Sequence, residues 1–474
     1  MSIWSPMRPK LVLGSYGPIF SQYALGPAEV ATHKHLLGVT GMGKSMLMAS
    51  MFVQLLNQGV GVALIDPHSD LALNILGLLY DTKFFDHPQA FDRLLYVDFA
   101  RSDRALPFNV LNQPYDDHTV ARNIAEVCKR AWPALGDGSA PNFENIMLAA
   151  TLVLVQNHLP LTELPRLLTD KAFRDGLLQN VTDSVVVDFF LSRFDRWGKE
   201  APMLIESTLR RAFLLTFSPA LRYSLGQREN ALNFRDLMDR GVSLICNLGG
   251  LDEDSQRFLG CLITVGYEMA ALSRADVPEE ARRQYHLIID EFSMFSAQSE
   301  EALARMLSLT RKFGLYCTLA HQSWTQLSQR LQGALGNCID VAFRLGRGDA
   351  VWAAPRFGQF DPYLVKHEVL DPDQVDRTHP LYFNVQETHE GWARALEELR
   401  PREAYVKVAN RTAKIRTLKF PPRKASVSEL RALTDQYAAQ LMRPRSGGEE
   451  NTNEQRPMSA QGQLVFRSVP IKDR

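Results

Sequence analysis

The stretch GVTGMGKS, residues 38–45, matches the phosphate-loop pattern G-x-x-x-x-G-K-[ST] at every fixed position. In that pattern the glycines let consecutive backbone N–H groups curl around phosphates, and the lysine ammonium meets the outer phosphates. The serine hydroxyl is a ligand for Mg²⁺. The stretch therefore predicts a nucleoside triphosphate site, formed by Thr40, Gly41, Met42, Gly43, Lys44, Ser45 and Met46.

The residues on both sides of the loop predict the strand, loop, helix and strand that such a site requires. His35-Leu36-Leu37 resembles the end of a strand, and apolar residues then repeat at helical spacing from Met46 to Leu56. Gly59 is a natural helix stop. The almost wholly apolar run Gly61–Asp66 is typical of a buried parallel strand, and Pro67 ends it.

Composition allows a large soluble protein and excludes one that binds nucleic acid through its overall charge. The chain has 474 residues, enough for about two to four domains, and 45% of them are hydrophobic. Lys+Arg and Asp+Glu both number 53, so a nucleic-acid site must depend on a local patch.

Three further signals indicate a reduced, cytoplasmic environment. No apolar run reaches the about 18 residues of a membrane span, since the best candidate, residues 260–272, contains Glu268. Pro6, Arg8, Pro9 and Lys10 stand where a signal peptide needs an apolar core. The 5 cysteines are scattered without C-x-x-C spacing, which predicts reduced core residues and no zinc site.

The pattern along the chain predicts an α/β fold with an all-helical insertion. Strands and helices alternate over residues 35–106 and 231–420, which favours a mostly parallel sheet with helices on both faces. Residues 107–230 have helical periodicity with few strand-like runs. The remaining predicted segments are an extended edge segment at 1–34, a C-terminal helix at 421–442 and a disordered tail at 443–474.

Hydrolysis requires a second motif, and Leu287-Ile288-Ile289-Asp290-Glu291 predicts it. A buried strand would deliver Asp290 to the Mg²⁺ shell and place Glu291 to orient and polarise the attacking water. The alternative is that both carboxylates cap the following helix.

Gln322 and Arg311 are the other candidates. Gln322 follows the apolar strand Leu315–Ala320, where a sensor of the γ-phosphate should lie, although a surface-loop glutamine is the alternative. Arg311 ends the predicted helix Ser299–Phe313, where basic residues ordinarily complement the helix dipole.

Six segments in order resemble one known family. They are HLLGVTGMGKS with GVALIDPHSDL, then APNFENIMLAATLVLV, SPALRYSLGQ, YHLIIDEFSMF and LTRKFGLYCTLAHQ. Together they are similar to the coupling-protein ATPases of conjugative type IV secretion systems, in the HerA/FtsK branch of RecA-like motors. The resemblance spans about residues 35–420 and includes an all-helical insertion.

This resemblance implies a hexameric ring that hydrolyses ATP with Mg²⁺ and moves single- or double-stranded DNA through a central pore. It assigns Lys44 and Ser45 to the phosphate loop, Asp290 and Glu291 to Mg²⁺ and water, and Gln322 to the sensor. Arg311 matches the arginine finger that a neighbouring subunit inserts. A relaxase and secretion-channel proteins are the implied partners.

The chain departs from the family pattern in two places. The usual coupling protein has N-terminal transmembrane helices, so we expect this chain to be recruited to the inner membrane by an anchoring partner, if at all. The usual Asp-Pro-His-Gly-Asp turn has Ser69 instead of glycine, within residues 66–70, so the geometry of that loop cannot be assumed.

Two alternative functions stay open. One is a HerA-type translocase that processes DNA with a nuclease, and the other is a nucleotide-dependent assembly or recruitment protein. The insertion could select cargo or act as a structural lid. All of these interpretations require that the nucleotide held by Lys44 and the carboxylate of Glu291 meet across adjoining strands of one sheet.

Overall fold

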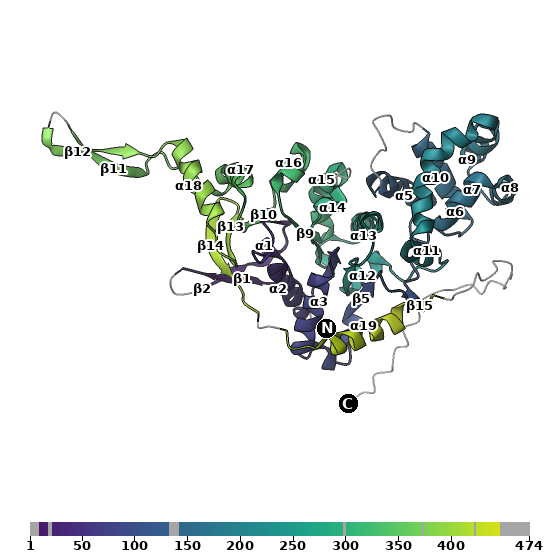
Figure 1. The fold of residues 1–474 in the computed structure, drawn as a ribbon, viewed down its shortest axis with the longest axis horizontal. Helices are drawn as coiled ribbons and strands as arrows, with labels where there is room; N and C mark the ends of the chain where they lie inside the picture. The colour runs from purple at the N-terminus through teal and green to yellow at the C-terminus, as the bar shows by residue number, and fades with distance from the viewer. Residues whose placement is uncertain are drawn as a thin grey trace.

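The computed structural model describes residues 9–17, 21–131, 142–296, 300–371, 374–420 and 423–445. An 11-stranded sheet with the order β2-β1-β14-β13-β10-β3-β9-β8-β4-β7-β5 runs through the centre of the molecule (Figure 1). This is the α/β fold with a central, mostly parallel sheet that the alternating pattern predicts.

The parallel part of the sheet carries the nucleotide motifs. Its strands, in spatial order, are β10 (Ile339–Ala342), β3 (Lys34–Leu37), β9 (Leu315–His321), β8 (Tyr285–Ile289), β4 (Gly61–Asp66), β7 (Ser243–Asn247) and β5 (Leu94–Asp98). They are short and almost entirely buried, as strands covered on both faces must be.

An antiparallel edge extends the sheet beyond β10. Its strands are β13 (Glu403–Val408), β14 (Arg411–Thr417), β1 (Leu11–Tyr16) and β2 (Ser21–Leu25). The N-terminal strands thus form the edge of this sheet, and β13 and β14 pair as an antiparallel hairpin.

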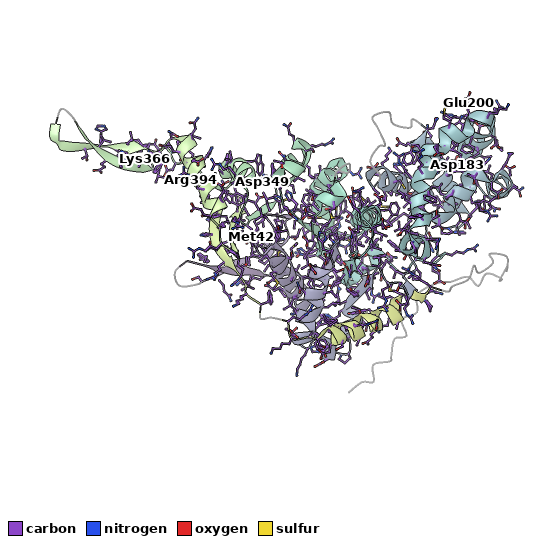
Figure 2. All side chains as sticks on the ribbon, in the orientation of Figure 1. Met42, Asp183, Glu200, Asp349, Lys366 and Arg394 are labelled. Atoms are coloured by element: carbon purple, nitrogen blue, oxygen red, sulfur yellow. The ribbon has the colours of Figure 1, made fainter. Side chains whose placement is uncertain are left out.

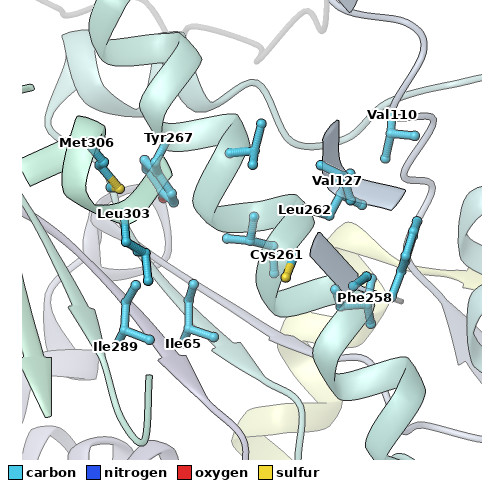
Figure 3. Packing of buried hydrophobic residues seen from close by; sticks show 14 of the residues in the cluster. Ile65, Val110, Val127, Phe258, Cys261, Leu262, Tyr267, Ile289, Leu303 and Met306 are labelled. Atoms are coloured by element: carbon cyan, nitrogen blue, oxygen red, sulfur yellow. The ribbon is translucent and has the colours of Figure 1, made fainter. Parts of the chain in front are cut away.

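Both faces of the sheet are buried under helices. Val62 and Leu64 of β4 belong to a core with residues of α2 (Lys44–Asn57), α3 (Asp70–Asp81) and α19 (Val427–Leu441). Ala63 and Ile65 belong to the opposite core, with α12 (Phe234–Arg240), α13 (Glu253–Ser273) and α15 (Glu300–Leu309). Figure 3 shows Phe258, Cys261 and Leu262 of α13 in that second core.

The helices between β6 (Arg104–Ala105) and α12 gather at one end of the molecule (Figure 1). They are α5 (Asp117–Ala131), α6 (Phe143–Gln156), α7 (Leu164–Thr169), α8 (Lys171–Leu178), α9 (Ser184–Asp188), α10 (Ala201–Phe217) and α11 (Pro219–Leu225). Helix α5 packs against both α13 and α6 and so joins this group to the core. Asp183 and Glu200, labelled in Figure 2, lie within the group.

Other elements complete the chain. They are the helices α1 (Pro27–Val30), α4 (Ala90–Arg93), α14 (Ser293–Ser296), α16 (Gln329–Leu335), α17 (Arg347–Phe357) and α18 (Val385–Glu397). Strands β11 (Val365–Asp371) and β12 (Gln374–Tyr382) form a hairpin that projects from the body in Figure 1 and that the sequence pattern does not predict.

The C-terminal end departs from the predicted tail. Arg443 and Pro444, assigned by composition to a disordered segment, form strand β15 and pair with β6. Two residues pair here because α19 delivers the chain beside β6. The rest of the predicted tail, residues 446–474, lies outside the described residues. Within the described ranges, no helix combines the length and apolar character needed to cross a membrane.

Candidate nucleotide site

The phosphate loop connects β3 to α2 and has the backbone conformation that its glycines allow. Gly43 precedes the first helical residue with φ of 113°, and Gly41 has φ of 78°. Residues with a Cβ rarely adopt such angles. The N-terminus of a 14-residue helix therefore faces the loop, and its free N–H groups favour an anion there.

Lys44 is held inside the loop. Its side chain is buried, and its Nζ donates hydrogen bonds to the carbonyl oxygens of Gly38 and Val39. Burial lowers the pKa of Lys44, while the carboxylates of Glu291 and Asp290 act in the opposite direction. The ammonium group and these carboxylates therefore share one electrostatic environment, although they come from different segments of the chain.

The phosphate loop is also contacted by two segments from the C-terminal part of the chain, those of Phe343 and Arg402. No sequence motif marks either segment. The backbone N–H of Arg402 donates to the carbonyl oxygen of Met42 at 2.9 Å, and Arg402 itself has φ of 72°. Phe343 packs so closely on Gly38 that a Cβ at Gly38 would lie 2.6 Å from the Cβ of Phe343. The loop is thus fixed by residues that follow β10 and precede β13.

Asp290 and Glu291 follow β8 directly. The backbone N–H of Asp290 donates to the carbonyl oxygen of Ile65 at 3.1 Å, which fixes the end of β8 against β4. Burial raises the pKa of Asp290 to about 6, and the neighbouring carboxylates Asp66 and Glu291 add to the effect. Such a buried carboxylate gains from a nearby cation.

Glu291 has a left-handed backbone conformation, and two hydrogen bonds hold its carboxylate in place. Its φ of 45° lies in the left-handed region, which costs a non-glycine residue of order 1 kcal/mol. Its Oε1 accepts a hydrogen bond from the Ser293 hydroxyl at 2.8 Å, and its Oε2 accepts one from Gln322 Nε2 at 3.0 Å. The side chains of Glu291 and Gln322, 31 residues apart, therefore meet.

The strand order corrects one expectation. Strands β3 and β8 are not adjacent, because β9 lies between them. Lys44 and Glu291 thus approach across three strands, and Gln322 emerges from the middle one. The apolar runs alone carry no information on which strand pairs with which. The position of β9 between β3 and β8 could therefore not be predicted from the sequence.

Arg311 lies far from this end of the sheet. It belongs to the short 3₁₀ turn Thr310–Phe313, which precedes β9, whereas Gln322 follows β9. A strand of 7 residues spans about 20 Å. The exposed Arg311 therefore lies at the amino ends of the parallel strands, whereas the phosphate loop of its own chain lies at their carboxyl ends.

Strand β4 ends in a further carboxylate, that of Asp66, and a turn follows it. Asp66 is fully buried and accepts hydrogen bonds from the backbone N–H groups of His68 at 2.9 Å and Ala72 at 2.8 Å. Ser69 has φ of 69°, the conformation that glycine adopts most easily, and its hydroxyl donates to Asn247 at 2.8 Å. That hydrogen bond helps to hold serine in the strained conformation.

A divalent ion at this site would depend on the phosphates for most of its ligands. Within the described part of the chain, no group of three or more His, Cys, Asp or Glu residues is arranged to hold a metal. Mg²⁺ commonly takes one or two carboxylates together with substrate phosphates and water. Asp290, with its raised pKa, and Ser45 in the first turn of α2 fit that donor set.

Comparison with known proteins agrees with this architecture. Residues 24–72 match the family model described as Helicase HerA, central domain. No curated protein matches the chain by sequence.

Solved structures match most of its length. The bacterial conjugative coupling protein TrwBdeltaN70, in its unbound monoclinic form, has a TM-score of 0.59 at 18% identity over 85% of this chain and 89% of its own. TrwB in complex with ADP and Mg²⁺ has a TM-score of 0.56 at 19% identity, over 84% and 88%. VirB4 of Thermoanaerobacter pseudethanolicus has a TM-score of 0.53 at 12% identity, over 87% and 97%. This chain therefore shares its fold with the TrwB and VirB4 structures, and its residues 24–72 also match the HerA central-domain model.

Proposed function

We propose that this chain is a cytoplasmic ATPase that moves DNA, or recruits it, for transfer between cells. The observation that carries the proposal is the meeting of Glu291 and Gln322 at the strand ends that also present the buried Lys44. Lys44 and its loop would bind the phosphates, Glu291 would act as the base for water, and Gln322 contacts Glu291 through a hydrogen bond. These residues lie within a fold that the coupling protein TrwB shares.

Each residue of the site has a separate role in the proposed hydrolysis of ATP. The loop from Thr40 to Met46 holds the triphosphate through backbone N–H groups, and Lys44 neutralises its outer phosphates. Glu291 accepts a proton from water as the water oxygen bonds to the γ-phosphorus and the bond to the bridging oxygen of ADP breaks. Mg²⁺, bound by Ser45, Asp290 and phosphate oxygens, would neutralise the developing charge.

Gln322 is suited to report the state of the γ-phosphate. Its amide nitrogen already donates to Glu291, and its amide oxygen leaves a second hydrogen-bonding group at the end of β9. A change in phosphate contact at Gln322 would therefore be transmitted to the catalytic carboxylate and along β9. This is the coupling that a motor requires between chemistry and movement.

The position of Arg311 supports an assembly in which subunits complete one another's sites. Because it lies at the far edge of its own sheet, it can reach a nucleotide only on a neighbouring copy. A closed ring of six, as the resemblance implies, gives every subunit one such neighbour. A membrane-anchoring partner, a relaxase and channel proteins are the other proposed partners.

The first test is ATP hydrolysis with no DNA, with single-stranded DNA and with double-stranded DNA, at fixed salt. A DNA motor should hydrolyse ATP faster with at least one of the two, and the preferred one identifies the substrate strand. Equal rates in all three conditions would contradict the proposal and favour the assembly-protein alternative.

The HerA central-domain match supports a second candidate, a translocase that works with a nuclease. Affinity purification of the full chain from its native host distinguishes the two. Co-purification with a nuclease favours DNA processing, whereas a relaxase or secretion-channel proteins favour conjugative transfer.

Asp290 predicts a pH dependence of Mg²⁺ binding. Its pKa is raised to about 6, so the carboxylate is ionised above that pH and gains a proton below it. Proton and metal then compete, and Mg²⁺ affinity should fall about tenfold per pH unit below about pH 6. Mg²⁺ titrations of nucleotide binding at pH 5 and pH 7 measure this effect.

Asp290→Asn is the control for that experiment, because ATP itself also binds protons and Mg²⁺. The variant should bind Mg²⁺ weakly and retain only the pH dependence that belongs to ATP. An identical pH dependence in both proteins would show that Asp290 does not bind the metal.

Arg311 predicts complementation between two inactive variants. Arg311→Ala should lower kcat by about a thousandfold or more, the range for loss of an arginine finger. Lys44→Ala should also be inactive, because it lacks the phosphate-loop cation. Mixed assemblies should regain activity, since Arg311 of the Lys44→Ala subunit completes the intact loop of the other.

Lys312→Ala is the matched control, because Lys312 is the neighbouring basic residue of the same turn. It should hydrolyse ATP at close to the wild-type rate. Equal losses in the Arg311 and Lys312 variants, or no recovery on mixing, would refute the role in the neighbouring site.

A further inference from the structure

Two buried histidines lie directly behind the candidate sensor. His35 is on β3, immediately before the strand residues that lead into the phosphate loop, and His321 ends β9 and precedes Gln322. Their Nε2 atoms are 2.7 Å apart. His35 is 2% exposed and His321 is 0% exposed. The two rings thus link the strand of the loop to the strand of the sensor.

Each ring makes a second hydrogen bond to an oxygen atom. His35 Nδ1 lies 2.9 Å from Asp340 Oδ1, and His321 Nδ1 lies 2.9 Å from the carbonyl oxygen of Ser323. Both oxygens can only accept. The Ser323 oxygen is a peptide carbonyl, and Asp340 is a carboxylate because the Arg356 guanidinium donates to it at 2.6 and 3.0 Å.

The number of protons follows from these three contacts. The outer nitrogens must both carry hydrogen, because each faces an acceptor. The contact between the two Nε2 atoms needs one further hydrogen, since two lone pairs would repel each other at that distance. The pair therefore holds three protons on four ring nitrogens, one more than two neutral imidazoles carry.

The surroundings indicate where the additional proton resides. Burial lowers the pKa of His321 to about 2, so His321 stays neutral and carries its hydrogen on Nδ1. His35 Nδ1 faces the Asp340 carboxylate, whereas His321 Nδ1 faces a neutral peptide carbonyl, so the additional proton belongs on His35. The other charged groups around the pair are Arg356, Asp349, Lys407 and Lys44.

Aromatic side chains exclude water from the pair. Trp324 lies over His35 with ring centroids 5.3 Å apart and stacks on Trp352 at 3.4 Å. Phe292, which follows Glu291, meets the His321 ring edge-on at 5.0 Å. His321 therefore touches the segment that carries the candidate base as well as preceding the sensor. Asp349, labelled in Figure 2, bonds the backbone N–H of Trp324 from α17.

We propose that His35 and His321 form a singly protonated imidazole pair that positions Gln322 and Glu291 relative to the phosphate loop. The positioning role rests on the proposed ATP hydrolysis, whereas the protonation state does not. The shared proton holds the carboxyl end of β9 against β3. Removing it breaks the contact between the rings and releases the end of the strand from which Gln322 projects.

The protonation state is tested on the full chain with ¹⁵N-labelled histidine, by NMR at about pH 8. The chain has 11 histidines, and the variants His35→Asn and His321→Asn assign the two signals by their loss. We expect His35 to be doubly protonated and His321 to be the neutral Nδ1–H form, because the three contacts of the pair need three hydrogens. Two neutral rings at that pH would overturn the proposal.

The positioning role is tested with His321→Asn. The asparagine amide can replace Nδ1–H and donate to Ser323, but it has no atom at the place of Nε2. Of the two hydrogen bonds of His321, only the one to His35 is therefore lost, together with the ring contact to Phe292. A misplaced catalytic group costs up to about a hundredfold. We expect kcat to fall about ten- to a hundredfold with little change in the KM for ATP.

The pH profile separates positioning from general damage. In the wild type, kcat should fall at alkaline pH as the shared proton is lost, and this decline should be absent in His321→Asn. The control is His286→Leu, because His286 is a buried histidine of β8 whose ring nitrogens have no hydrogen-bond partner in the structure.

His286→Leu should retain the wild-type alkaline decline. The same decline in His321→Asn, or an equal loss of kcat in both variants, would contradict the positioning role. If the wild type hydrolyses no ATP, the proposed function fails, and the NMR experiment still decides the protonation of the pair.

Discussion

The parallel pairing of β3, β9 and β8 is the constraint on which the site depends. Parallel strands end at the same edge of a sheet, so the residues that follow them are brought together whatever their separation in sequence. Here that edge collects the phosphate loop, the Asp290-Glu291 pair and Gln322. Helices cover both faces of these strands, and the apolar strand residues pack into the core on one side or the other.

The site also concentrates groups that are costly to bury. Lys44 and Asp290 have pKa values shifted toward their neutral forms, and Glu291 has a left-handed backbone. Shifted carboxylates and local strain of this kind cluster at functional sites. A bound nucleotide with its metal would supply the negative phosphates that Lys44 lacks and the cation that Asp290 lacks. The site is thus arranged for a ligand that carries both charges.

Much of the fold could be predicted from sequence because its signals are local. The phosphate loop, the apolar strand Gly61–Asp66 and the strand before Asp290 each show their character within a few residues. The position of β9 could not be predicted, since it depends on pairing between distant segments. The hairpin Val365–Tyr382 was missed for another reason. Its described side chains, at 365–369 and 378–382, are largely exposed, so they form no buried apolar face that would produce an alternating pattern.

The same distinction applies to the candidate site. Lys44, Asp290 and Gln322 follow recognisable patterns, whereas Arg402 and Asp340 act through contacts to residues hundreds of positions away. No motif in the sequence around His321 distinguishes it from a histidine that only packs in the core. Only the strand register, which places His321 opposite Leu37 and Asp340 opposite His35, reveals the hydrogen-bonded chain.

The proposed role of Glu291 as the base in ATP hydrolysis is tested by measuring ATP binding and turnover in the variant Glu291→Gln. Glutamine keeps the size of the side chain but cannot take the proton from water. If Glu291 is the base, this variant should bind ATP about as well as the wild type and turn it over about a hundredfold or more slowly. Glu280→Gln, at the opposite end of β8, should hydrolyse ATP normally. Wild-type turnover by Glu291→Gln would contradict the account.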